Sequence, residues 1–276
     1  MPADLHIHTF FSDGTQSPEE IVELAKKGGL TTIAITDHDV VAGIERAKKK
    51  GAELGVAVIP GIELTTEAFD SEIHILGYFI DTQSAELLEI ISKIQKSRED
   101  RIFTICEKLQ ALGVKLDPDK VFAIAGHRAA GRPHVARALI AEGYVKNFKE
   151  AFVRYLDFHG PAYVSHYKLS PAEAIKLVLA ADGLPVFGHP AVSACDQCIP
   201  ELMSTGLVGL EVYYGAHNQG QTQHYLELAE KYGLLLTGGS DYHGSTSGRE
   251  IKLGDFSIAD DLVEKLKNEH LRRNKS

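Results

Sequence analysis

The chain has little cysteine and no long apolar segment. Its 276 residues include only three cysteines, Cys106, Cys195 and Cys198, too few for a disulfide framework, which agrees with a reducing compartment. No run of 18 apolar residues occurs, and the start Met1-Pro2-Ala3-Asp4 lacks a basic segment followed by an apolar core. We therefore expect no membrane span and no signal peptide, and we expect a cytoplasmic protein.

The chain also has fewer basic than acidic side chains. The formal net charge is −9 with neutral histidines, so the surface as a whole does not attract long nucleic acid, and we expect no duplex DNA as a partner. That count omits bound cations. If several acidic residues are metal ligands, two or three divalent ions would reverse the local field and let the site accept a phosphate.

Two short motifs are given structural interpretations. Cys195-x-x-Cys198 has no second pair and no thioredoxin-like context, so we interpret it as a loop with two thiols and not as a zinc or redox site. Gly238-Gly239 is followed by neither a Gly-x-Gly-x-x-Gly pattern nor a Walker lysine. We interpret this pair as a close backbone approach beneath Asp241.

Strands and helices alternate in both halves of the chain. Buried strands are predicted at 31–36, 56–60, 72–78, 185–187, 209–213 and 234–237, and polar residues stand where they end. Ser17-Pro18 and Ser170-Pro171 are typical helix starts, with serine as the N-cap. This alternation predicts an α/β fold with a parallel sheet covered by helices and a site on the rim of a barrel or open sheet.

The middle of the chain has a different pattern. Apolar residues from Leu87 to Leu112 recur at helical spacing and predict one long helix that ends at Gly113, with shorter helices at 118–125, 133–142 and 148–156. We interpret the charges there as solvated surface. The alternation resumes at Ala162-Tyr163-Val164. The predicted organisation is a barrel in two parts, 1–83 and 161–276, with a small helical insertion domain at 84–160.

Histidines and carboxylates gather at the predicted strand ends. His6 and His8 are two residues apart, so in an extended strand their imidazoles point to the same side while Leu5 and Ile7 pack inward. The candidate metal ligands are His6, His8, Asp13, His38, Glu63, His74, His189, Asp241 and His243. Nine ligands exceed what one ion can use, so we expect two or three divalent ions, and a mixed imidazole and carboxylate set permits Mn, Zn or Fe.

These motifs carry a family resemblance. His6-x-His8, Asp13-Gly14, Thr36-Asp37-His38, Gly61-x-Glu63, His74, Gly188-His189-Pro190 and Ser240-Asp241-x-His243 resemble, in order, the motifs of the PHP family, named for polymerase and histidinol phosphatase. The resemblance covers nearly the whole chain. It implies a distorted seven-stranded (β/α) barrel with a two- or three-metal phosphoesterase site.

Within the family, the chain is most similar to phosphatases of nucleoside 3′,5′-bisphosphates, some of which also trim RNA from its 5′ end. Gly131-Arg132-Pro133-His134 matches the motif whose arginine and histidine bind phosphate in that branch. The resemblance implies that Arg132 and His134 hold a substrate phosphate, although Arg132 could also be an ordinary first-turn residue of the helix that Pro133 opens. Tyr163 and Lys168 are further candidates for substrate contact, and solvated surface positions are the alternative.

The resulting hypothesis is a metal-dependent phosphoesterase, a hydrolase in which a metal-bridging hydroxide attacks phosphorus in line. The candidate catalytic residues are His6, His8, Glu63 and Asp241, with Glu63 as the bridging carboxylate by resemblance. The general acid stays open among Asp37, the metal shell and His134. The expected substrate is a nucleoside bisphosphate such as adenosine 3′,5′-bisphosphate, or a short 5′-phosphorylated RNA.

Two alternatives remain. A histidinol-phosphate phosphatase would share the chemistry but need no second phosphate pocket. A noncatalytic PHP module would bind metal for stability or dock to a polymerase, and such modules often lose ligands. The sequence does not determine the oligomeric state, the metal identity, which ligand binds which ion, or whether the insertion moves on binding.

Overall fold

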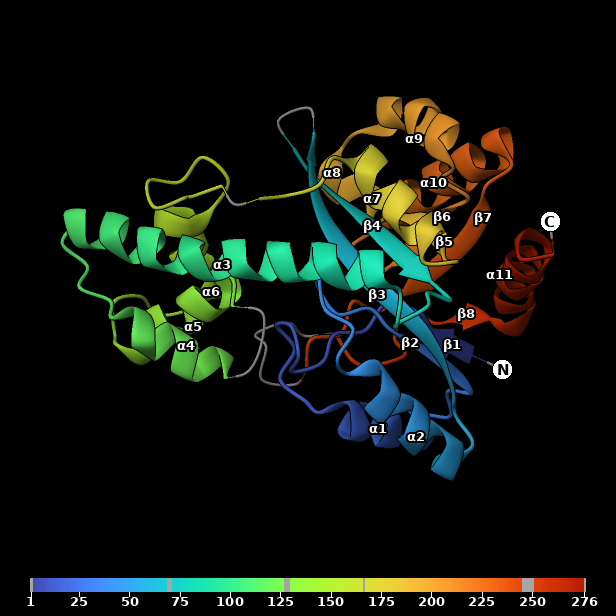
Figure 1. Ribbon diagram of the computed structural model, residues 1–276, viewed down its shortest axis with the longest axis horizontal. Helices are drawn as coiled ribbons and strands as arrows, with labels where there is room; N and C mark the ends of the chain where they lie inside the picture. Colours follow the sequence, from blue (N-terminus) through green and yellow to red (C-terminus); the bar gives the residue numbers. More distant parts are fainter. Residues whose placement is uncertain (1, 69–70, 127–129, 166, 245–250, 276) are drawn as a thin grey trace.

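The protein is a barrel with a helical arm on one side (Figure 1). This computed structural model describes residues 2–275 apart from 69–70, 127–129, 166 and 245–250. One sheet of eight strands has the order β7-β6-β5-β4-β3-β2-β1-β8. The strands are β1 (Pro2–Asp4), β2 (Thr32–Ile35), β3 (Ala57–Ala68), β4 (Ser71–Tyr78), β5 (Leu184–Gly188), β6 (Gly209–Tyr214), β7 (Leu235–Gly239) and β8 (Ile258–Ala259).

Most neighbouring strands are parallel, but β4 is antiparallel to both β3 and β5. The sheet closes on itself where the segment after β1 meets the end of β7 and the segment that follows β7. Leu5 N donates to Gly238 O at 3.2 Å, and His8 N donates to Tyr242 O at 2.9 Å. The predicted seven-stranded barrel is thus confirmed as a nearly closed sheet, to which the two-residue β8 adds an antiparallel partner for β1.

Helices surround the barrel because each parallel connection returns across its outside. They are α1 (Pro18–Lys27), α2 (Ile44–Leu54), α7 (Pro171–Ala180), α8 (Pro190–Ser193), α9 (Ile199–Thr205), α10 (Gln219–Tyr232) and α11 (Asp260–Arg273). The predicted starts of α1 and α7 are confirmed. Ser17 and Ser170 each accept a hydrogen bond from the backbone N–H of a glutamate three residues on, which bonds back to the serine.

The arm begins with the long helix α3 (Ala85–Ala111), drawn across the centre of Figure 1. Beneath it lie α4 (Pro118–Ala125), α5 (Arg132–Ala141) and α6 (Phe148–Ala151), and a π-helical turn, Phe152–Leu156, follows α6 in the chain. The first half of α3 packs in the barrel core through residues such as Ile94, and its second half packs in a separate core through Ile102. The division at residues 84 and 160 stays a prediction, which these two cores support.

Some predictions were wrong in detail. Ala162-Tyr163-Val164 begins in a turn and continues without regular secondary structure, because it packs on the helical arm instead of a sheet edge. Cys195 and Cys198 are paired as a disulfide and are not two separate thiols. Their Cα atoms lie 5.5 Å apart in the turn after α8, within the range that a disulfide spans. Among the described residues, we find no helix with the length and apolarity to cross a bilayer.

Candidate metal centre and phosphate pocket

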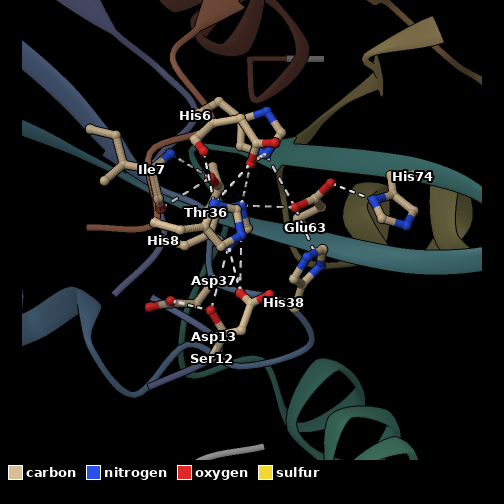
Figure 2. Close-up of polar contacts among 12 residues, drawn as sticks. His6, Ile7, His8, Ser12, Asp13, Thr36, Asp37, His38, Glu63 and His74 are labelled. Carbon is tan, nitrogen blue, oxygen red and sulfur yellow. Dashed lines mark hydrogen bonds and ion pairs between the residues drawn. The ribbon is translucent and has the colours of Figure 1, made fainter. Parts of the chain in front are cut away.

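The histidine pair after β1 lies where the sequence predicts. Leu5 and Ile7 are fully buried in the cores, while the imidazoles of His6 and His8 point together toward Glu63 (Figure 2). Gly239 allows this packing, because a Cβ atom there would lie 2.4 Å from His6 N. The close backbone approach predicted at this glycine is confirmed, and it lies beneath His6.

Glu63, on β3, is the centre of the cluster. Its Oε2 lies 3.1 Å from Nε2 of both His6 and His8 and 3.3 Å from His38 Nδ1. Its Oε1 lies 2.6 Å from His74 Nδ1 and 2.9 Å from His189 Nε2. Five imidazoles thus surround one buried carboxylate, and that Glu63 bridges two ions stays a prediction.

Two carboxylates flank this centre. Asp241 Oδ1 lies 3.1 Å from His8 Nε2, and Asp13 Oδ1 lies 3.2 Å from His243 Nε2. Three sets of side chains have their ligand atoms within 4.8 Å of one another: His8, Asp13, His38 and His243; His6, His8, Glu63 and Asp241; and His38, Glu63 and His74. The structure therefore brings together all nine candidate ligands, since His189 joins through Glu63.

The geometry of these atoms fits metal coordination better than hydrogen bonding. His8 Nε2, Asp13 Oδ1 and His243 Nε2 are buried, and within the described residues none has a hydrogen-bond partner despite the short distances. Buried polar atoms without partners are costly in a folded protein. Nitrogen and carboxylate atoms that converge on common points in this way suit divalent ions.

Charges within the cluster are strongly coupled. Burial disfavours the charged imidazole of His8, but the Asp241 and Glu63 carboxylates outweigh it and raise its pKa to about 10. Burial lowers the pKa of His38 to about 3, so this imidazole is neutral. For Glu63, burial alone would raise the pKa, yet the neighbouring histidines hold it well below its usual range.

Metal loading of the metal-free protein is expected to release protons at pH 7. His8 holds a proton there because its pKa is about 10, and coordination requires the neutral imidazole. Metal affinity should therefore increase with pH up to about 10. Calorimetric titration with Mn²⁺ in two buffers of different ionisation enthalpy measures the released protons. Equal heats in both buffers would contradict this prediction.

A pocket beside the cluster is lined by arginines. The residues that line it are Ser12, Asp13, His38, Thr65, Glu72, His74, Arg98, Arg101, Gly131, Arg132, Pro133, His134 and Phe152. Candidate metal ligands of the barrel thus share one pocket with Arg98 and Arg101 of α3 and Arg132 of α5. The interpretation of the charges of the arm as solvated surface was wrong for Arg98 and Arg101, which are 8% and 4% exposed.

The predicted substrate residues occupy different positions around this pocket. Arg132 and His134 line it, and Arg132 donates to Glu72 Oε2 and to Leu156 O. Lys168 does not line the pocket; its Nζ donates a hydrogen bond to Glu72 Oε1 at 2.6 Å. Tyr163 packs with its ring centre 5.4 Å from the guanidinium carbons of both Arg101 and Arg132.

Asp37 stabilises the loop that follows β1. Its carboxylate accepts hydrogen bonds from Thr9 N, Thr9 Oγ1 and Ser12 Oγ at 2.6–2.7 Å. These bonds fold the loop after β1 so that Asp13 returns over the cluster. Asp37 does not line the arginine pocket.

Comparison with known proteins agrees with this site. The model of the PHP domain matches residues 4–164, more than half of the chain. The chain belongs to the PHP family. The ordered motifs and the barrel are thus those of a PHP protein.

Several PHP relatives are similar over most of their length. The 3′,5′-nucleoside bisphosphate phosphatase of Chromobacterium violaceum is 29% identical over 90% of both chains. The phosphoribosyl 1,2-cyclic phosphate 1,2-diphosphodiesterase of Eggerthella lenta is 29% identical over 88% of this chain and 95% of its own. The 5′-3′ exoribonuclease of Haemophilus influenzae is 31% identical over 87% of this chain and 89% of its own.

A crystal structure from Bifidobacterium adolescentis, described as a metal-dependent phosphoesterase, superposes with a TM-score of 0.89. It is 32% identical and covers 96% of this chain and 94% of its own. Together with the family match, these relatives make the chain a phosphoesterase of the hydrolase class that depends on divalent metal ions.

One residue of this PHP site was missed by the sequence analysis. Glu211, on β6, is fully buried; its Oε1 lies 2.9 Å from His6 Nδ1, and its Oε2 accepts from His189 N at 2.7 Å. It therefore orients His6 with Nε2 toward the cluster. A carboxylate between Leu210 and Val212 in a buried strand was the available signal, because burying a charge requires a strong partner.

Glu211→Gln is expected to weaken metal binding and to lower activity by about 10- to 100-fold, as is usual when a partner of a metal-binding histidine is changed. The amide cannot supply the negative charge that holds the N–H of His6. Metal content after dialysis, measured by elemental analysis, checks this directly. Full metal content in a variant with an unchanged melting temperature would contradict it.

Proposed function

We propose that the protein hydrolyses a phosphate ester of a nucleoside 3′,5′-bisphosphate, or of the 5′ end of a short 5′-phosphorylated RNA. One observation carries the proposal: the arginine pocket adjoins the candidate metal centre, so one molecule with two anionic groups fits both. The names of the relatives from Chromobacterium violaceum and Haemophilus influenzae agree with it.

The pocket has the electrostatics of a phosphate site. Burial and the nearby Arg132 and Arg98 lower the pKa of Arg101 to about 9, which shows how closely these cations are crowded. A phosphate between them would relieve this repulsion, and the planar guanidinium groups can each offer two donors to its oxygens. Arg132 and His134 keep their predicted roles in this proposal. The ring of Tyr163 packs against the guanidinium groups of Arg101 and Arg132. Lys168 acts on the pocket indirectly, through its hydrogen bond to Glu72.

The nine candidate ligands would hold two or three divalent ions, and their mixed imidazole and carboxylate atoms suit Mn, Zn or Fe. Ions bound there would supply an activated water and neutralise charge on the reacting phosphate. The residues of the chain do the rest. Glu63 and Asp241 fix the cluster, while α3 and α5 hold the second phosphate and so place the first one at the cluster.

A histidinol-phosphate phosphatase is the weaker alternative. Its substrate carries a single phosphate and a cationic amine, and an amine would be repelled by the arginines that line the pocket. A noncatalytic module is also disfavoured, since every candidate ligand is present and converges on the cluster.

The proposal is tested by elemental analysis of gently purified protein together with phosphate release from adenosine 3′,5′-bisphosphate. Two or three ions per chain and release from one position are expected. Histidinol phosphate, a 5′-phosphorylated oligoribonucleotide and a cyclic 1,2-phosphate of ribose are compared on the same sample. Faster turnover of histidinol phosphate or of the cyclic ester would reject the proposed substrate while leaving the phosphoesterase assignment intact.

A further inference from the structure

One buried aspartate contacts both the barrel and the long helix α3 of the arm. Asp39 follows β2 and is fully buried. On the arm side, its Oδ2 accepts from Arg98 Nη2 and its main-chain oxygen accepts from Gln95 Nε2 at 3.0 Å. On the barrel side, its N–H donates to Glu63 O at 3.0 Å, and its Oδ1 accepts from Thr65 N at 3.2 Å.

These contacts lie between the two halves of the proposed substrate site. Asp39 is covalently next to His38 and hydrogen-bonded to the backbone of Glu63, both in the candidate metal cluster. Arg98 lines the phosphate pocket one helical turn from Arg101. Asp39 is absent from the residues that line the pocket, so it acts on substrate only through these neighbours.

Hydrophobic packing alone does not fix this junction. Ile94 of α3 belongs to the barrel core and Ile102 to the core of the arm, and Arg98 stands between them. Apolar contacts are non-directional, whereas a hydrogen bond between a guanidinium and a carboxylate is strong and has a defined geometry. The Asp39–Arg98 pair, together with the hydrogen bond from Arg98 Nη2 to Thr65 Oγ1 at 3.2 Å, is therefore a directional contact that holds α3 against the rim of the barrel.

The backbone conformation at Asp39 restricts which residues can replace it. Its φ is +51°, in the left-handed region that only aspartate, asparagine and glycine adopt readily. An asparagine keeps both the shape and this backbone tolerance. Asp39→Asn thus removes the charge and leaves the turn.

We propose that Asp39 is a positioning residue that fixes the separation between the metal cluster and the arginine pocket, and so selects substrates whose two phosphates match that separation. This inference rests on the proposed function. It predicts that weakening the junction harms a substrate that touches both sites more than one that touches only the cluster.

The test compares Asp39→Asn with the wild-type protein, both metal-loaded, on two substrates. Adenosine 3′,5′-bisphosphate occupies both sites, and p-nitrophenyl phosphate has no second phosphate. The ratio of kcat/KM for the bisphosphate to kcat/KM for p-nitrophenyl phosphate is expected to fall about tenfold or more, mainly through KM of the bisphosphate. Metal content is measured on the same samples.

Three results would overturn the inference. An unchanged or higher ratio in the variant would show that Asp39 does not position Arg98 for substrate. An equal loss on both substrates with reduced metal content would show that Asp39 acts through His38 and the cluster alone. A wild-type protein that does not prefer the bisphosphate would overturn the proposed function itself, and with it the selection assigned to Asp39.

Gln95→Met provides a second variant in case Asp39→Asn does not fold. It removes the hydrogen bond to Asp39 O from a partly exposed position and leaves the buried charges in place. The same ratio is expected to fall about two- to fivefold, as for the loss of one neutral hydrogen bond. An unchanged ratio in the folded variant would overturn the inference.

Discussion

Glu63→Gln is expected to lower kcat/KM about a thousandfold, which corresponds to a loss of about 4 kcal/mol in transition-state stabilisation. Its carboxylate is within 3.3 Å of five imidazole nitrogens. A neutral amide cannot balance the charge of neighbouring ions or bridge them with both oxygens. Steady-state kinetics on adenosine 3′,5′-bisphosphate, with elemental analysis of the same protein, measure the effect.

The matched control is Glu53→Gln, the same change on the outer surface of α2. The side chain of Glu53 is 54% exposed and its nearest cation, Lys50, lies 3.8 Å away, so both activity and metal content are expected to stay at the wild-type level. Retention of both metal and activity by Glu63→Gln would show that the bridging carboxylate lies elsewhere.

Arg132→Ala is expected to raise KM for adenosine 3′,5′-bisphosphate by about 10- to 100-fold, since hydrogen bonds to charged groups contribute about 1.5–3 kcal/mol. The substitution also leaves Glu72 in the pocket without its arginine partner, and this carboxylate then repels the phosphate. The rise should be much smaller for p-nitrophenyl phosphate, which has no second phosphate. Initial-rate measurements on both substrates separate the two effects.

Arg154→Ala is the control for this experiment. Arg154 belongs to the same arm, its side chain is 47% exposed, and it pairs with Glu150 four residues before it. The KM of this variant for adenosine 3′,5′-bisphosphate is expected to equal that of the wild-type protein, because exposed ion pairs of this kind contribute little free energy. If Arg132→Ala binds the bisphosphate as tightly as the wild-type protein does, the second phosphate does not lie in the arginine pocket.

Much of the candidate metal centre was predictable because it follows from strand geometry. Side chains at the ends of parallel strands meet on one edge, so His38 after β2 and His189 after β5 had to lie near His6 and His8. The residue types then limited the chemistry to metal binding. Glu63 and His74 met for a different reason, because the hairpin of β3 and β4 pairs the strands that carry them.

The phosphate pocket was less predictable. Arg98 and Arg101 follow Ile94 by four and seven residues, so their spacing places them on the buried stripe of α3. Their charge, not their spacing, suggested a position on the surface. They are buried because Arg98 bonds to Asp39 on the rim of the barrel and the ring of Tyr163 packs against Arg101. Spacing thus indicates which face of the helix is buried, but it does not indicate which residues lie opposite that face.

Residue type and local periodicity were enough to predict the candidate ligands, the alternating barrel and the helical arm, because they encode these features directly. The packing of the whole chain was needed to show that Glu211 orients His6, that Asp39 links the candidate metal cluster to α3, and that three arginines share one pocket with candidate metal ligands. The residues in these contacts are 22 to 205 positions apart in the sequence or belong to separate helices and strands. Their formation depends on how whole elements pack, which local patterns do not specify.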